Sequence, residues 1–244
     1  MPHLLAIDTS TDACSVALLA DGVVHRDHRV AARAHARLIL PMIDELLSRA
    51  GVPRSRLDGI TFGCGPGSFT GLRIAASVVQ GMAWPLGLPV FPRSSLELLA
   101  RSAAAEAEAE AGAVLDQAAG VLTLMDARMD EVYWNLFVRE DGDLRATGED
   151  ALAAPEALGA LLPDRTGSAA DRPWILVGDG LHYLDRIGAG VPQALCSLAE
   201  TKPDARWLLE SAAADLAAGR GRDAAAAVPV YLRDERRWRR LDRQ

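Results

Sequence analysis

The stretch Leu4-Leu5-Ala6-Ile7-Asp8-Thr9-Ser10-Thr11-Asp12 decides the fold class, because a short apolar run ends in a polar turn near the start of the chain. A second apolar run, Cys14 to Leu19, follows the turn, so the two runs predict a pair of strands. Asp21-Gly22 is a strong hairpin signal, and Val23 to Val30 can then return as a third strand. The chain is therefore predicted to begin with three meandering strands.

Beyond residue 33, apolar residues recur at three- and four-residue spacing, which is typical of helices. The spacing predicts a helix from Arg33 to Ala50, which Pro41 either delays or kinks because proline cannot donate to the carbonyl four residues earlier. The next expected elements alternate: strand 59–63, helix 70–84, strand 88–91 and helix 94–105. Meandering strands followed by helix-linked strands predict a mixed sheet with helices on its faces.

An alanine-rich segment, residues 103–119, separates this pattern from a second, weaker one. Strands are expected at 121–125, 132–138 and 174–177, and helices at 155–162 and 204–218. Strands again come before helix-linked strands, which suggests an ancient duplicated unit. We therefore expect two lobes: residues 1–102 with approximately 220–244 form the first, and residues 103–219 form a smaller second lobe.

The charge balance limits the classes of partner. The chain has 244 residues and a net charge of −7, which argues against a free-standing nucleic-acid binder, so any contact with nucleic acid is expected to be shared with a partner. The Arg-rich end of the chain is either a solvated terminus or a contact with a nucleic acid or a partner. Its basic and aromatic residues are Arg233, Arg236, Arg237, Trp238, Arg239, Arg240 and Arg243.

The cysteines and histidines indicate neither a disulfide framework nor a metal site. Cys14, Cys64 and Cys196 are odd in number and form no C-x-x-C pair. His25 and His28 would point to opposite sides of a strand, and no H-x-x-x-H motif occurs, so we expect no intrinsic metal. No apolar stretch approaches the ~18 residues of a membrane span, so we expect a cytoplasmic protein without membrane contact.

Two segments have residues suited to a phosphate group. Asp8, Thr9 and Ser10 offer a carboxylate and two hydroxyls at a strand end, although ordinary turn capping explains the same residues. Gly65 and Gly67 lie in a glycine-rich segment before a helix, where positive φ, close approach and the helix N-terminus suit an anion. The alternative for this segment is a tight turn with Ser68 or Thr70 as the helix N-cap. It lacks the Gly-Lys-Ser or Gly-Lys-Thr ending of a P-loop.

The helix after the glycine-rich segment has two apolar stripes, Ile74-Val78-Met82 and Leu72-Ala76-Val79-Ala83. A helix on a sheet needs only one apolar face, so the second stripe is predicted to be covered by something else. Together with the 33–50 helix it offers a patch for an isologous dimer or a similar partner. The alternative is that the second lobe or the C-terminal helix covers it.

Several segments, spread from residue 4 to residue 233, together resemble the TsaB family in identity and order. They are Leu5–Ser10, Ala13–Ala17, Leu40–Ile43, Gly65–Arg73, Asp126–Trp134 and Pro229–Arg233. The runs GPGSFTGLRI and DARMDEVYW are specific to that family, whereas IDTS is shared with many actin-like ATPases and sugar kinases. The resemblance implies an α/β, actin-like ATPase (ASKHA) fold of two RNase H-like lobes with mixed sheets.

The resemblance also implies a non-catalytic subunit. TsaB is similar to a paralogue, TsaD, which binds metal and nucleotide and transfers a threonylcarbamoyl group to adenosine 37 of tRNAs that read A-starting codons. TsaB pairs with TsaD, an ATPase named TsaE completes the assembly, a homodimer is expected when the chain is alone, and tRNA is met only through the complex. The implied interface residues are Leu38, Ile39, Met42, Ile43, Leu46, Leu72, Ala76 and Val79.

The sequence departs from an active relative at two places. Where TsaD has a metal-binding histidine pair, this chain reads Arg93-Ser94-Ser95-Leu96-Glu97-Leu98, and Asp126-Ala127-Arg128 lacks the Gly and Thr of a second phosphate turn. We therefore expect no catalytic residue and no resident cofactor, with at most weak ATP or ADP binding through Asp8, Thr9, Ser10, Gly65 and Gly67. The alternatives are an active actin-like ATPase or kinase, a metallopeptidase, or a tRNA-binding protein that uses residues 234–244.

Overall fold

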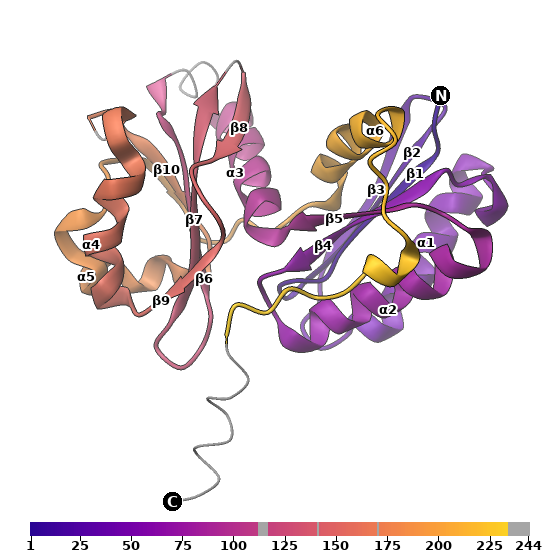
Figure 1. Cartoon of the computed structure of the whole chain (residues 1–244), viewed down its shortest axis with the longest axis horizontal. Helices are drawn as coiled ribbons and strands as arrows, with labels where there is room; N and C mark the ends of the chain where they lie inside the picture. Colours follow the sequence, from indigo (N-terminus) through magenta and orange to yellow (C-terminus); the bar gives the residue numbers. More distant parts are fainter. Residues whose placement is uncertain (112–116, 141, 170, 234–244) are drawn as a thin grey trace, which may run out of the picture.

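The chain folds into two α/β lobes that lie side by side, each built around one mixed sheet (Figure 1). This computed structural model describes residues 1–111, 117–140, 142–169 and 171–233. The Arg-rich terminus from residue 234 onward therefore lies outside the described residues, and so does the middle of the alanine-rich segment. The predicted α/β class with two lobes is confirmed.

The first sheet has the strand order β3-β2-β1-β4-β5. Its strands are β1 Leu4–Asp8, β2 Ala13–Ala20, β3 Val23–Val30, β4 Gly59–Gly65 and β5 Val90–Ser94. The first three strands are antiparallel, and β4 and β5 then add in parallel, as the hairpin signal and the helix-linked pattern predicted. Every residue of β1 is buried, so this strand is the centre of the lobe.

The second sheet repeats this arrangement in the order β8-β7-β6-β10-β11. Its strands are β6 Gly120–Asp126, β7 Val132–Glu140, β8 Asp143–Ala146, β10 Trp174–Val177 and β11 Ala194–Leu198, and the short β9 Ala151–Ala153 also pairs with β7. Again three antiparallel strands come first and two parallel strands follow. The shared order supports the predicted duplicated unit.

Six α-helices cover the sheets within the described residues. They are α1 His35–Ala50, α2 Phe69–Leu86, α3 Ser95–Ala111, α4 Pro155–Thr166, α5 Leu184–Ile187 and α6 Leu209–Ala217. Short 3-10 turns accompany them, among them η6 Ala205–Leu208 and η7 Ala224–Ala226. Helix α1 begins at His35, and Pro41 lies inside it, so the predicted early start at Arg33 was wrong by two residues.

Alternation along each strand divides the apolar side chains between two faces. In β1, Leu5 and Ile7 pack with α1 and α2, whereas Leu4 and Ala6 pack with η6 and α6. In the second sheet one face packs on α4 and α5, and the other packs on α3. Helix α3 therefore lies between the lobes (Figure 1).

The structure corrects the predicted lobe boundary. Residues 204–217, assigned to the second lobe from sequence, pack on the first sheet: Ala205, Leu208 and Leu209 join Leu4 and Ala17 in one buried cluster. This position is possible because the outer face of a five-stranded sheet needs an apolar cover, and neither α1 nor α2 provides it. Among the described residues, no helix combines the length and apolar character needed to cross a bilayer.

Candidate functional site

The turn after β1 is closed by its own hydrogen bonds. Asp8 Oδ1 accepts hydrogen bonds from the backbone N–H of Ser10 at 3.0 Å and from its hydroxyl at 2.8 Å. Thr9 Oγ1 donates to the Gly71 carbonyl at 2.8 Å, and the Ser68 amide donates to the Ser10 carbonyl at 2.7 Å. The hydroxyls and amides suited to a phosphate are therefore used inside the chain.

The glycines of the following loop are explained by close backbone contact. A Cβ on Gly71 would lie 1.9 Å from the Thr9 carbonyl oxygen, and one on Gly67 would lie 2.5 Å from that of Ser10. Gly67 also has a φ of 157°, which L side chains rarely adopt. The loop packs directly on the turn after β1, so its glycines serve a backbone-to-backbone contact.

Burial perturbs the carboxyl group of Asp8. Its side chain is completely buried, which raises its pKa from an ordinary 3.8 to about 7, and the nearby Asp204 adds to the rise, while the hydrogen bonds from Ser10 oppose it. Among the described residues, none donates a hydrogen bond to Oδ2. This oxygen fills the space beside Gly63, where a Cβ would lie 1.9 Å away.

These contacts bury most of the residues predicted to meet a phosphate. Asp8, Thr9 and Ser10 are at most 1% exposed, and Gly65 is buried beneath the C-terminal segment, with the Val230 carbonyl oxygen 2.6 Å from a Cβ at that position. A phosphate could reach these residues only if the loop moved away. Of the two interpretations of the glycine-rich segment, the tight turn is the one observed, with the Ser68 hydroxyl accepting from the Gly71 amide at 3.3 Å.

The serines in place of a histidine pair have structural contacts. Ser94 Oγ donates to Asp150 of the second lobe at 2.6 Å and accepts from the Glu97 amide at 3.1 Å, while Ser95 Oγ accepts from the Gly65 amide. Burial raises the pKa of the Asp150 carboxyl, and the hydrogen bonds from Ser94 and Asn135 oppose the rise. Ser94 therefore joins the lobes where the chain first crosses between them.

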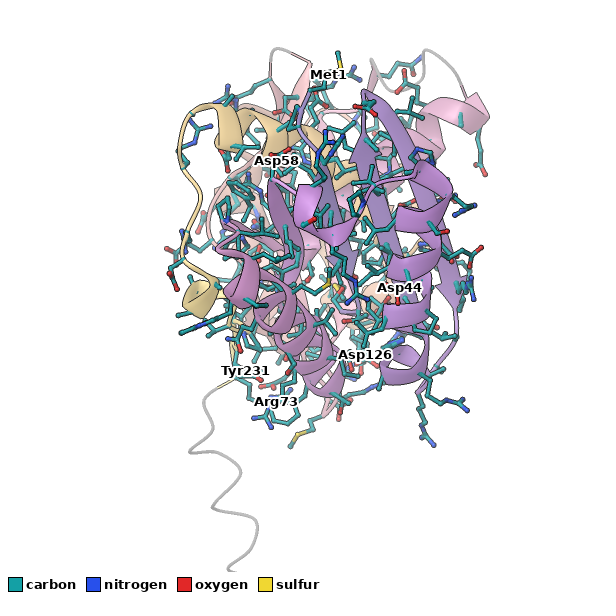
Figure 2. All side chains as sticks on the ribbon, turned by 90° about the vertical axis from the view of Figure 1, so that its right-hand side faces the viewer. Met1, Asp44, Asp58, Arg73, Asp126 and Tyr231 are labelled. Carbon is teal, nitrogen blue, oxygen red and sulfur yellow. The ribbon has the colours of Figure 1, made fainter. Side chains whose placement is uncertain are left out.

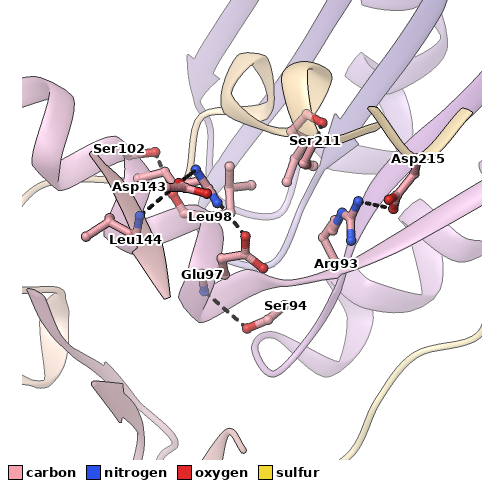
Figure 3. Close-up of polar contacts among 11 residues, drawn as sticks. Arg93, Ser94, Glu97, Leu98, Ser102, Asp143, Leu144, Ser211 and Asp215 are labelled. Atoms are coloured by element: carbon pink, nitrogen blue, oxygen red, sulfur yellow. Dashed lines mark hydrogen bonds and ion pairs between the residues drawn. The ribbon is translucent and has the colours of Figure 1, made fainter. Parts of the chain in front are cut away.

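A cavity of about 940 Å³ lies between the lobes on the side of α3 and α6. Its lining includes Arg93, which pairs with Asp215 (Figure 3). It also includes Arg101, which pairs with Glu97 and Asp143. Each of these two arginines therefore has carboxylate partners in the chain. In the part of the chain that the structure describes, no group of three or more His, Cys, Asp or Glu side chains could hold a metal ion.

The predicted interface residues are mostly buried inside the first lobe, which is a correction. Leu38 is partly exposed, but the other seven are at most 5% exposed. These seven are Ile39, Met42, Ile43, Leu46, Leu72, Ala76 and Val79. They pack within the first lobe, so the stripe assigned to a partner is the inward face of each helix.

The outward faces of α1 and α2 form a different surface. Together they line a groove of about 470 Å³, which we call the docking groove. Its lining residues are Ala36, Ile39, Leu40, Phe69, Thr70, Arg73, Ile74, Ser77 and Val78, of which only Ile39 was among the predicted eight. Leu40 is 42% exposed and Phe69 is 53% exposed, so the groove is apolar and open to solvent. The Ile74-Val78 stripe was the signal in the sequence that could have identified this surface.

Comparison with known proteins assigns the chain to a family. The profile of TsaD, tRNA N6-adenosine threonylcarbamoyltransferase, matches residues 20–237. The tRNA threonylcarbamoyladenosine biosynthesis protein TsaB of Haemophilus influenzae is 35% identical over 98% of this chain and 96% of its own length. TsaB of Escherichia coli is 34% identical over 98% of each chain.

Solved structures agree in fold. YeaZ from Pseudomonas aeruginosa superposes with a TM-score of 0.81 at 42% identity, covering 95% of this chain and all of that one. A second structure from the same organism, an uncharacterized protein with similarity to peptidase YeaZ, gives a TM-score of 0.82 at 42% identity over 96% of this chain and all of that one. The two-lobed fold and the full-length similarity thus place the chain in the TsaB (YeaZ) family.

Proposed function

We propose that this chain is the non-catalytic pairing subunit of a machinery that makes threonylcarbamoyladenosine in tRNA, and that it pairs with a TsaD-type catalytic paralogue. The docking groove carries the proposal, because it is the open apolar surface of α1 and α2. Exposed aromatic and aliphatic side chains of this kind are enriched in protein interfaces. A sister chain with the same helix pair could place its own α1 and α2 against it.

The chemistry of the groove favours a protein partner. Leu40, Phe69, Ile74 and Val78 give it apolar walls, and the small Ser77 lets another helix approach closely. Trp84, 67% exposed, extends the apolar surface toward the end of α2. A stable interface usually buries ~1,600 Å² in total, which requires the helices beside the groove to take part as well.

The closed turn after β1 supports a role without catalysis. In this chain the Asp8 carboxyl is buried with a raised pKa, and the Thr9 hydroxyl is bonded to Gly71. A nucleotide phosphate would have to displace these contacts. The proposal keeps the TsaE-type ATPase as a further partner, a homodimer when the chain is alone, and tRNA contact only through the assembled complex.

Co-expression tests the proposal directly. The tagged chain is purified with and without the TsaD-type paralogue, and tRNA nucleosides are analysed by mass spectrometry after the chain is depleted from cells. We expect a stoichiometric complex and loss of threonylcarbamoyladenosine. Steady ATP or peptide turnover by the purified chain, without the paralogue, would instead support the competing enzyme hypothesis.

A further inference from the structure

We propose that residues 227–233 form a C-terminal latch that fixes the second lobe relative to the docking groove, with Arg233 as its locking side chain. The segment follows η7, runs along the first lobe and ends between the two lobes (Figure 1). It is the last described part of the chain. The latch concerns the lobe arrangement in the isolated chain, and its effect on pairing rests on the proposed function.

On the first lobe, the latch is held by backbone and side-chain contacts. The Ala227 carbonyl accepts a hydrogen bond from Gln80 at 2.9 Å, and the Val230 amide donates to the Cys64 carbonyl at 2.7 Å. Tyr231 packs on Phe69 with ring centroids 5.3 Å apart. The latch is therefore anchored to α2 and to the end of β4.

On the second lobe, Arg233 provides the attachment. Its guanidinium donates to the Glu131 carboxylate at 2.6 and 3.0 Å and to the carbonyls of Ala127 and Arg128 at 3.0 and 3.1 Å. The two ionic side chains are only 13% and 15% exposed, so water screens this pair little. A planar guanidinium suits several acceptors at fixed angles, which a lysine cannot match.

The attachment point on the second lobe is a strained turn. Arg128, Met129 and Asp130 have φ angles of 61°, 56° and 58°, which place three consecutive non-glycine residues in the left-handed region. Such a conformation persists only where surrounding contacts hold it. Arg233 bonds to the carbonyls just before and within this turn, so the same side chain holds the turn and closes the latch.

The latch also reaches the docking groove. Arg73 donates to the Tyr231 hydroxyl at 3.0 Å, and its guanidinium lies 3.8 Å from the Phe69 ring centroid. Arg73 and Phe69 both line the groove. Figure 2 shows Arg73, Tyr231 and Asp126 at the same end of the molecule. A change in lobe orientation would therefore move side chains on which the partner is proposed to dock.

Single-molecule energy transfer tests the latch in the isolated, full-length chain. Dyes are attached at Ser55→Cys in the first lobe and Leu161→Cys in the second, in a Cys196→Ser background in which the other two cysteines are buried. High dilution keeps the chains apart. We expect Arg233→Ala to broaden the interlobe distance distribution and Arg233→Lys to give an intermediate width. Arg145→Ala, which breaks an exposed ion pair with Glu140 inside the second lobe, should leave it unchanged.

A distribution for Arg233→Ala identical to that of the unsubstituted chain would overturn the proposal. If Arg233→Ala does not fold, Glu131→Gln is measured in its place. This variant removes the negative charge that attracts the Arg233 guanidinium, so it should broaden the distribution even though one side-chain acceptor remains. An unchanged width would again refute the latch. Affinity for the TsaD-type paralogue should fall about tenfold in the broadened variants. Failure of the unsubstituted chain to pair would reject the proposed function and leave the distance result standing.

Discussion

Val78 and Val79 are adjacent in α2, yet Val79 is fully buried in the core of the first lobe and Val78 lines the open docking groove. Successive residues of a helix point about 100° apart, so one position decides whether a side chain faces the core or a partner. The pair separates two properties that are usually mixed in interface mutants, namely folding and association.

Arginine substitutions at these two positions should affect different properties, stability at Val79 and pairing at Val78. Val79→Arg buries an unpaired charge and should lower the free energy of unfolding by roughly 3–5 kcal/mol. Val78→Arg leaves its guanidinium in solvent, so the melting temperature should stay nearly unchanged while pairing with the TsaD-type paralogue is lost. Thermal melts and co-purification measure both, and a Val78→Arg chain that still co-purifies in full would place the interface elsewhere.

Two glycines of α2 should respond oppositely to alanine. A Cβ at Gly71 would meet the Thr9 carbonyl oxygen at 1.9 Å, so Gly71→Ala must displace backbone and should destabilise the chain by about 1–3 kcal/mol. At Gly81 a Cβ meets nothing within 4 Å, so Gly81→Ala should stabilise the helix by up to about 1 kcal/mol. Urea unfolding of both variants checks the difference, and equal effects would show that the loop does not pack tightly on the turn after β1.

The stability of the chain should depend on pH through Asp8. Because its folded pKa of about 7 lies above the ordinary 3.8, the folded state keeps a proton that the unfolded state releases, and stability is lost as pH rises through about 7. Between about pH 5 and pH 8 the titration of this group alone should lower the free energy of unfolding by roughly 2–3 kcal/mol.

Asp8→Asn removes that titration. The difference in unfolding free energy between Asp8→Asn and the unsubstituted chain should therefore shift in favour of the variant as pH rises over this interval. Using the difference cancels the contribution of other groups, such as Asp150, whose pKa is also raised. A difference that does not vary with pH would mean that Asp8 is ionised throughout.

Two serine hydroxyls provide a test of the contact between the lobes. Ser94→Ala removes the donor to Asp150 and the acceptor for the Glu97 amide at the start of α3, and should destabilise the chain by about 1–3 kcal/mol. Ser211→Ala removes a single bond from α6 to the Leu208 carbonyl and should cost about 0.5 kcal/mol or less. Differential scanning calorimetry of the two variants compares these costs.

The strands were predictable from sequence where apolar and polar residues mark both ends. Val23–Val30 and Trp174–Val177 have the predicted bounds. The strand Ala194–Leu198 was missed because none of its residues is buried, so it lacks a clear alternating pattern. The spacing within residues 204–218 does predict a helical segment, but the spacing contains no information on which of the two sheets that segment covers.

The orientation of α1 and α2 was the main failure. Both stripes of α2 are apolar, and the inward one contains small residues such as Ala83, a pattern that also predicts a partner helix. In the structure small residues of α2 such as Ala75 and Ala83 lie in the core against its own sheet, and the larger Ile74 and Val78 are only partly buried at the edge of that core. A single sequence cannot separate these cases, because both sheets and partner helices select small residues. Arg233 was also missed, since its acceptors lie about a hundred residues earlier in the chain.

The return of residues 204–217 to the first sheet has a consequence for synthesis on the ribosome. The face of β1 and β2 that carries Leu4, Ala6 and Ala17 is only partly covered, by α3, until η6 and α6 emerge after the second lobe. The second lobe, by contrast, is encoded without interruption. We therefore expect it to acquire its native structure on the nascent chain before the first lobe, although its codons are read later, and the exposed early strands are where a chaperone would bind.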